Sequence, residues 1–220
     1  YNRDCEIFPV VNAMFELIFG KSPYKSPTEM GVNMAGNCII DDEACREASK
    51  QEIIRRYYKC LCEKRRNGTT KDDICKLELL MKQAEITVED RKVTIVALER
   101  EKNENGNPAM AIELGDGTIV SGGTSELLGA ASSALINALK VLAGIDKEVK
   151  LIDPKAIDPI QDLKINYLGS KNPRLHTDEV LTALSATAAN NEIAMKAMKK
   201  LPLLKGCDAH STVLLSSVDE

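Results

Sequence analysis

Two histidines, one cysteine and one aspartate carry the groups best suited to acid–base or nucleophilic chemistry. His176 and Asp178 lie at a predicted helix start, and Cys207 and His210 lie just before a predicted final strand. The chain has no other histidines. Imidazoles transfer protons near neutral pH, and with a thiol and carboxylates they could form a metal site or a Cys–His nucleophile pair. The alternative is that His176 and Asp178 only cap a helix and that Cys207 is buried. Zinc-type ligand spacing is missing, so we assign no metal, and the cofactor is unknown.

Cations and a glycine-rich turn form a second group, suited to binding an anion. Lys171 and Arg174 precede the helix predicted to begin at Thr177, where backbone N–H groups and the helix dipole favour negative charge. Ser125 ends the run Gly122 to Ser125, whose glycines permit close backbone approach. Together they predict a site for a phosphate- or carboxylate-bearing metabolite. Ordinary capping and a tight turn are the alternative.

A polar segment from Lys21 to Asn37 is the third candidate. It contains Lys25 and Asn33 among proline and glycine residues. A connection this long is often functional, so it could clamp a ligand or cover a neighbouring domain. The alternative is a linker built of turns.

Hydrophobic spacing and turn residues predict the elements that position these groups. Residues 1–88 are expected to form a helical subdomain, with helices near 7–19, 41–66 and 74–84. Residues 89–220 are expected to form a three-layer α/β/α sandwich with a mixed sheet. Its strands are predicted at 93–98, 109–114, 118–121, 149–152 and 211–215, with a hairpin turn at Gly115-Asp116-Gly117. Its helices are predicted at 126–143, 153–168, 177–189 and 192–201.

Composition excludes several classes of protein. The chain has 220 residues, 44% of them hydrophobic, with a net charge of −4, no tryptophan and 4% aromatic residues. It lacks both the concentrated basic charge and the aromatic platforms of nucleic-acid binders. No apolar run reaches the roughly 20 residues of a membrane helix. Seven irregularly spaced cysteines predict free thiols and a cytoplasmic location.

Three unusual runs resemble one known family. They are SPYKSPTEMGVNMAGNCIIDD at 22–42, GSKNPRLHTDEVL at 169–181 and LKGCDAHSTVLLS at 204–216. They are similar to the uncharacterised bacterial family called domain of unknown function 1846 (UPF0371). The resemblance covers essentially the whole chain. It implies a fragment of a longer protein whose N-terminal α/β domain is absent here, and a C-terminal subdomain with a cytidine-deaminase-like fold. It brings no established reaction and no catalytic residues.

The predicted element order also resembles the cytidine-deaminase scaffold, but its zinc ligands are missing. In that scaffold a histidine or cysteine begins the helix after the hairpin, and two cysteines begin the next helix. Here the first helix offers only Ser132, Ser133 and Asn137, and the next begins at Asp153. Zinc deamination at these positions is therefore excluded.

Two functional hypotheses follow. The first is an enzyme or ligand-binding protein in which Lys171 and Arg174 bind a small anion while His176 or His210 transfers protons. The second is a non-catalytic assembly domain that packs against the N-terminal domain of the same protein or forms a homo-oligomer. Neither nucleic acid nor membrane is expected as a partner. The distance between the two histidine-bearing segments distinguishes the hypotheses, because one site requires that they meet.

Overall fold

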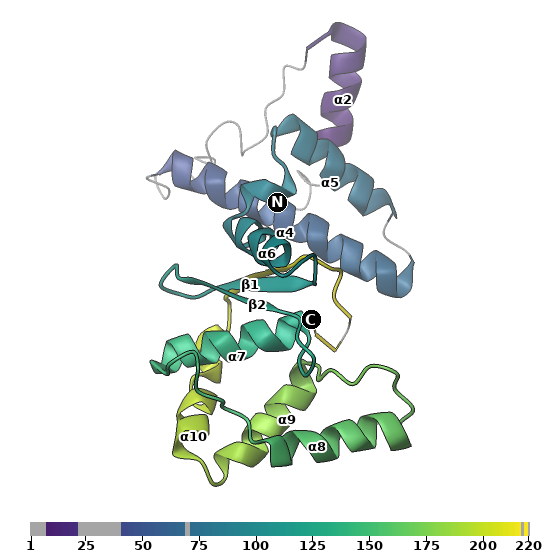
Figure 1. Ribbon diagram of the computed structural model, residues 1–220. Coiled ribbons are helices and arrows are strands. Elements are labelled where there is room, and N and C mark those ends of the chain that lie inside the picture. The colour runs from purple at the N-terminus through teal and green to yellow at the C-terminus, as the bar shows by residue number, and fades with distance from the viewer. Residues whose placement is uncertain (1–7, 22–40, 69–70, 217, 220) are drawn as a thin grey trace. The chain divides into compact units, whose positions relative to one another are not determined.

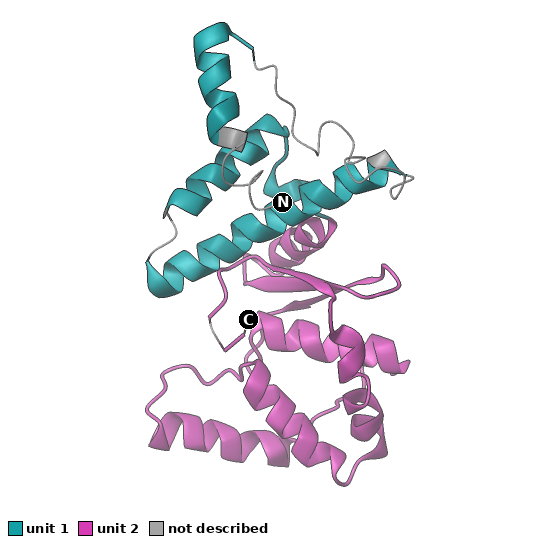
Figure 2. Ribbon diagram, turned by 180° about the vertical axis from the view of Figure 1, so that it is seen from behind, with its two compact units in different colours: residues 1–91 teal, residues 92–220 magenta. Residues whose placement is uncertain are grey.

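The computed structural model describes residues 8–21, 41–68, 71–216 and 218–219. Two compact units divide the chain, one covering residues 1–91 and the other residues 92–220 (Figure 2). None of the helices in the described ranges is long and apolar enough to cross a bilayer.

The first unit is helical. Helix α2 covers Phe8–Phe19, α4 covers Asp42–Asn67 and α5 covers Lys71–Gln83, with a short 3₁₀ turn, η2, at Val88–Asp90. The Asp41 carboxylate caps α4 by accepting the Ala44 N–H at 2.9 Å, and Gly68 ends the helix in the left-handed conformation at φ 74°. Buried apolar side chains of α4, α5 and the turn after α5 form the core of this unit. They are Ile53, Ile54, Leu77, Leu80, Met81 and Ile86.

The second unit begins with a helix where the sequence predicts a strand. Residues 93–98 lie within α6, Lys92–Asn103, so that prediction is wrong. The run Val93 to Val96 is rich in β-branched residues, which favour strands. However, the buried positions are Val93, Thr94 and Ala97, and this three-to-four-residue spacing places them on one helical face.

The predicted hairpin is confirmed. Strands β1, Ala109–Glu113, and β2, Ile119–Gly123, pair antiparallel in a register that places Ile112 opposite Val120. Gly117 takes the positive φ of 83° that the turn requires.

The mixed sheet is not confirmed. The sheet in the described residues has three strands in the order β2-β1-β3, and both pairings are antiparallel. The last strand, β3, covers Asp208–Ser211 rather than 211–215, and residues 149–152 form no strand. Leu128 and Leu175 pair in parallel only as an isolated bridge. The fold is thus of the mixed α+β class, and the expected deaminase-like topology is not confirmed.

Helices cover both faces of this sheet (Figure 1). Helix α7, Ala130–Ala143, packs on the face that carries Met110 and Ile112, whereas α6 packs on the face that carries Ala111. Gly122 permits the first contact, because a Cβ there would overlap the α7 backbone at Ala134. The side chains of successive strand residues therefore belong to different layers.

The remaining helices follow α7, and all of them except η3 contribute side chains to a second core against it. They are α8, Pro154–Asp162; the π-helix η3, Leu163–Tyr167; α9, Thr177–Ala188; α10, Glu192–Met198; and the 3₁₀ turn η4, Leu201–Leu204. Asp153 caps α8 through the Lys155 N–H at 2.9 Å. His176, not Thr177, is the N-cap residue of α9. The core joins α7 and α9 through Ile136, Leu139, Leu175, Val180 and Leu184.

Candidate functional site

The start of α9 is held by backbone contacts to the segment that precedes α7. The Leu175 N–H donates to the Leu127 carbonyl at 2.8 Å, and the Leu175 carbonyl accepts from Gly129 N at 3.3 Å and from Ser132 Oγ at 2.9 Å. Leu175 is fully buried. The residues that follow Leu175, including His176, are therefore fixed by the core.

A carboxylate of the chain itself occupies the predicted anion position. Asp219 Oδ2 lies 2.9 Å from His176 Nδ1, and Asp219 Oδ1 accepts from Thr177 N at 3.2 Å. Thr177 Oγ1 donates to the Val218 carbonyl at 2.7 Å. Negative charge at a helix N-terminus is favoured by the oriented N–H groups and the dipole. The start of α9 thus binds an anion, but that anion belongs to the C-terminal segment.

Arg174 and Ser125, both predicted ligand-binding residues, lie together. Arg174 Nε donates to the Ser125 carbonyl at 2.7 Å, and Ser125 Oγ accepts from Leu128 N at 3.0 Å. These bonds tie the segment before α9 to the turn before α7. Lys171 is exposed and makes no hydrogen bond or ion pair within the described ranges. Of the two predicted cations that the structure describes, Lys171 has no such bond and Arg174 does.

A buried ion pair supports the same region, and the sequence analysis did not include it. Lys164 Nζ lies 2.7 Å from Glu179 Oε2 and 2.6 Å from the Arg174 carbonyl. The Lys164 side chain is 7% exposed and that of Glu179 is 23% exposed. Glu179 Oε2 also accepts the His176 N–H at 2.8 Å, which completes the cap of α9. The spacing of His176 and Glu179 signals this cap, but nothing near Lys164 in sequence signals its partner.

The other predicted catalytic residues are not brought together. Cys207 packs with Ala209 against the cluster on the α7 face of the sheet, and its thiol lies 3.5 Å from the Leu203 carbonyl. His210 is buried and pairs with Ala111, whose side chain is on the α6 face. Directly opposed strand residues share a face, so Cys207 and His210 are on opposite faces. The structure therefore does not join Cys207 and His210 as a nucleophile pair.

The two histidines also lie apart. His176 begins α9, which packs against α7, whereas His210 is on the sheet face that α6 covers. Asp178 is exposed, and its carboxylate accepts the Glu179 N–H at 2.7 Å. The contacts of the described residues thus do not bring the two histidines together, and their catalytic role stays a prediction. Across the described part of the chain, His, Cys, Asp and Glu side chains form no group of three that could hold a metal. Lys25 and Asn33 lie outside the described residues.

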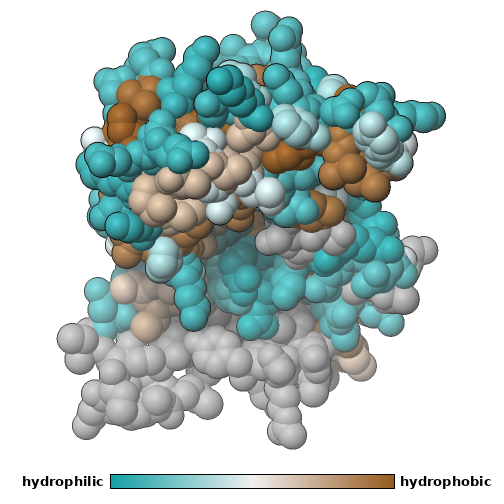
Figure 3. Space-filling model, turned by 90° about the horizontal axis from the view of Figure 1, so that it is seen from below, coloured by the Kyte–Doolittle hydropathy of each residue, from teal (hydrophilic) through white to brown (hydrophobic). Residues whose placement is uncertain are grey.

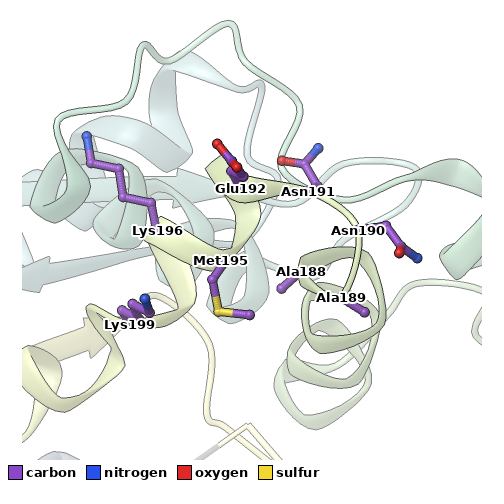
Figure 4. Close-up of a pocket in the computed structure, with 8 residues that line it drawn as sticks. All are labelled: Ala188, Ala189, Asn190, Asn191, Glu192, Met195, Lys196 and Lys199. Atoms are coloured by element: carbon purple, nitrogen blue, oxygen red, sulfur yellow. The ribbon is translucent and has the colours of Figure 1, made fainter.

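A surface pocket of about 450 Å³ lies between α9 and α10, and sequence reasoning did not single it out. Figure 4 shows the Met195 side chain lying between the two helices, toward Ala188, with polar side chains around the rim. The lining consists of Ala188, Ala189, Asn190, Asn191, Glu192, Met195, Lys196 and Lys199.

Comparison with known proteins places the chain in a family. Residues 1–85 match the N-terminal part of the domain of unknown function DUF1846, and residues 89–220 match its C-terminal part. The chain belongs to this family. The predicted resemblance is therefore confirmed, although the family's description names no activity.

Bacterial relatives match the whole chain. The UPF0371 protein of Corynebacterium glutamicum is 54% identical over 220 residues, and UPF0371 protein stu1377 of Streptococcus thermophilus is 55% identical over the same length. In both, the match covers 100% of this chain and 44% of the relative. The chain thus spans less than half the length of these relatives.

Proposed function

We propose that this chain is an assembly module that docks, through one face of α2, onto the remaining part of a longer polypeptide of the family. The supporting observation is an exposed apolar stripe. Val10, Met14, Leu17 and Ile18 are 45%, 55%, 88% and 64% exposed. They fall within an arc of about 100° on the helix, the width of an ordinary buried stripe. Asn12, on another side of α2, is buried.

Burial of this stripe would contribute favourably to the free energy of docking. Fully burying one large apolar side chain contributes about 1.5–3 kcal/mol, so completing the burial of these four gives about 4–8 kcal/mol before the cost of association. Exposed apolar side chains that gather on one helix face mark an interaction surface. On the face seen in Figure 3, hydrophobic residues are interspersed with hydrophilic ones.

The rest of the polypeptide is the proposed occupant because the relatives contain it. The matched region is 44% of the Corynebacterium glutamicum protein, so more than half of that relative lies outside this match. A helix with an exposed stripe inside one continuous polypeptide needs no separate partner. The cytoplasmic location remains part of this proposal, because none of the five described cysteines is in a disulfide.

Co-purification tests this proposal. The chain would be co-expressed with a polypeptide made of the unmatched part of the Corynebacterium glutamicum relative, and complex formation measured by size-exclusion chromatography with light scattering. We expect a one-to-one complex that Leu17→Asp abolishes and that Leu203→Asp preserves. Leu203 is a matched control because it is 53% exposed but lies in the other unit. A complex insensitive to Leu17→Asp, or a homodimer of this chain that Leu17→Asp disrupts, would contradict the proposed occupant.

The second candidate function is binding of a small anionic metabolite at the start of α9, with His176 as its proton-transfer group. The observation that favours it is that Thr177 N and His176 Nδ1 both contact a carboxylate, that of Asp219. The exposed cation Lys171 lies a few residues earlier in the sequence. An external phosphate or carboxylate would have to displace Asp219. Isothermal titration with inorganic phosphate should therefore show tighter binding to Asp219→Asn than to the unchanged chain. Equal or absent binding in both would remove this candidate.

A further inference from the structure

The pocket between α9 and α10 has an apolar floor and a rim rich in hydrogen-bond donors. Ala188 is buried, and Ala189 and Met195 extend the apolar lining. Its volume of about 450 Å³ lies within the ordinary range of small-molecule sites. The pocket therefore offers both apolar contact and polar recognition to one compact ligand.

Helix α10 and its C-cap residue supply half of this lining. Glu192, Met195 and Lys196 lie in α10, Lys199 is its C-cap residue, and all four line the pocket. Lys196 and Lys199 are exposed, and neither forms an ion pair within the described ranges. In Figure 4 Lys196 extends outward from α10, away from α9, whereas Met195 lies between the two helices. The lining therefore combines two lysines that form no ion pair within the described ranges with an apolar floor.

The remaining polar groups of the lining restrict the chemical class of ligand further. Asn191 uses its side-chain oxygen to accept the Ile193 and Ala194 N–H groups at 2.9 and 3.0 Å, which leaves its Nδ2 as a donor only. The lysines likewise donate and cannot accept. Glu192 is the one carboxylate in the lining. Donors outnumber acceptors, so a complementary ligand carries hydrogen-bond acceptors and negative charge.

We propose that this pocket binds a small organic acid in which a phosphate or carboxylate group is joined to a compact apolar body. The apolar body lies against Ala188, Ala189 and Met195, and the anionic group meets Lys196 and Lys199. Neither lysine takes part in the α2 stripe or in the start of α9. The proposal is thus independent of both functions proposed above.

Titrations followed by backbone amide NMR test the proposal on the whole 220-residue chain. Phenyl phosphate and benzoate carry both features and differ in the anionic group, whereas inorganic phosphate lacks the apolar body and phenol lacks the charge. We expect phenyl phosphate or benzoate to bind more tightly than inorganic phosphate and phenol, with the largest shifts at residues 188–199. The stronger of the two identifies the preferred anion. Equal binding of all four probes, or shifts confined to other residues, would overturn the proposal.

Two variants separate the contributions of charge and of the apolar floor. Lys196→Ala with Lys199→Ala should weaken binding of the preferred probe about tenfold or more, because charged hydrogen bonds are lost. The matched control, Lys150→Ala with Lys155→Ala, removes two exposed lysines of the same unit and should leave binding unchanged. Ala189→Leu should weaken binding by filling the floor while both lysines remain. Loss of binding in the control pair, or none in either pocket variant, would refute the site.

Discussion

Lys164→Met tests whether the buried ion pair holds the start of α9 in place. The change keeps most of the side-chain volume but removes an ammonium that lies 2.7 Å from Glu179 Oε2 and 2.6 Å from the Arg174 carbonyl. Losing a charged hydrogen bond costs about 1.5–3 kcal/mol when the partner stays buried. Here the Glu179 side chain is 23% exposed and keeps the His176 N–H, so the lower end of that range applies.

With the Arg174 carbonyl also losing its donor, Lys164→Met should lower the free energy of unfolding of the second unit by about 2–3 kcal/mol. In a chain of this length that corresponds to a fall in melting temperature of about 4–12 °C. Because two units need not unfold together, scanning calorimetry should be paired with hydrogen exchange at the amides of α9. Those amides should exchange faster in the variant.

Lys59→Met is the matched control. Lys59 Nζ is 3.9 Å from Glu63 Oε1, and its side chain is 55% exposed, so its removal should cost less than about 0.5 kcal/mol. The double variant Lys164→Met with Glu179→Gln should cost about 1–2 kcal/mol less than the sum of the two single changes. If Lys164→Met costs no more than Lys59→Met, the ion pair does not position α9, and the reasoning is refuted.

Three further predictions test other contacts. Gly122→Ala should destabilise the second unit by about 1–3 kcal/mol in thermal unfolding, because its Cβ would overlap the α7 backbone, whereas Gly115→Ala has open space and should be neutral within about 0.5 kcal/mol. Asp219→Asn should speed hydrogen exchange in the first turn of α9 and cost about 0.5–1 kcal/mol; unchanged exchange would show that the carboxylate is not holding the helix. The hydrogen bond from Arg55 lowers the pKa of Glu52 from 4.5 to about 2, so stability from this surface cluster is present above pH 4.5 and lost as pH falls toward 2. The loss should be under about 1 kcal/mol, and a Glu52 carboxyl NMR titration with a midpoint near 4.5 would contradict it.

Local signals in the sequence were sufficient for elements with distinctive turns or caps. The hairpin at Gly115 to Gly117 and the start and end of α4 at Asp41 and Gly68 lie where turn and capping chemistry predicts. The strand prediction at residues 93–98 was wrong. The β-branched residues there have a high strand propensity, but the residues that are buried follow a helical spacing. The short apolar run at 149–152 failed for a related reason. A short apolar run can contribute to a core whether it is extended, a turn or a helix. Here Val149 N donates to the Asp146 carbonyl in a turn rather than to a neighbouring strand.

The candidate site was predictable only where its partners have a recognisable local pattern. Arg174 was selected as a cation and Ser125 as part of a glycine-rich turn, and a hydrogen bond joins them in the structure. Asp219 and Lys164 were missed because their partners lie 43 and 15 residues away, a separation that no local spacing reveals. Lys164 is buried within the π-helix η3, whereas a lysine at the end of an amphipathic helix ordinarily points to solvent, so the sequence pattern did not predict its burial.

The bonds at the start of α9 explain why docking is a better-supported function than anion binding. An external anion would compete there with Asp219, which is tethered to the same chain and acts at an effective concentration on the order of millimolar. The competition weakens any external ligand, because Thr177 N and His176 Nδ1 are already satisfied. The α2 stripe has no such competitor within the described residues, and Leu17 remains 88% exposed. Docking at the α2 stripe gains the free energy of burying its apolar side chains. Binding at α9 gains only the difference between the binding free energies of the external anion and of the Asp219 carboxylate.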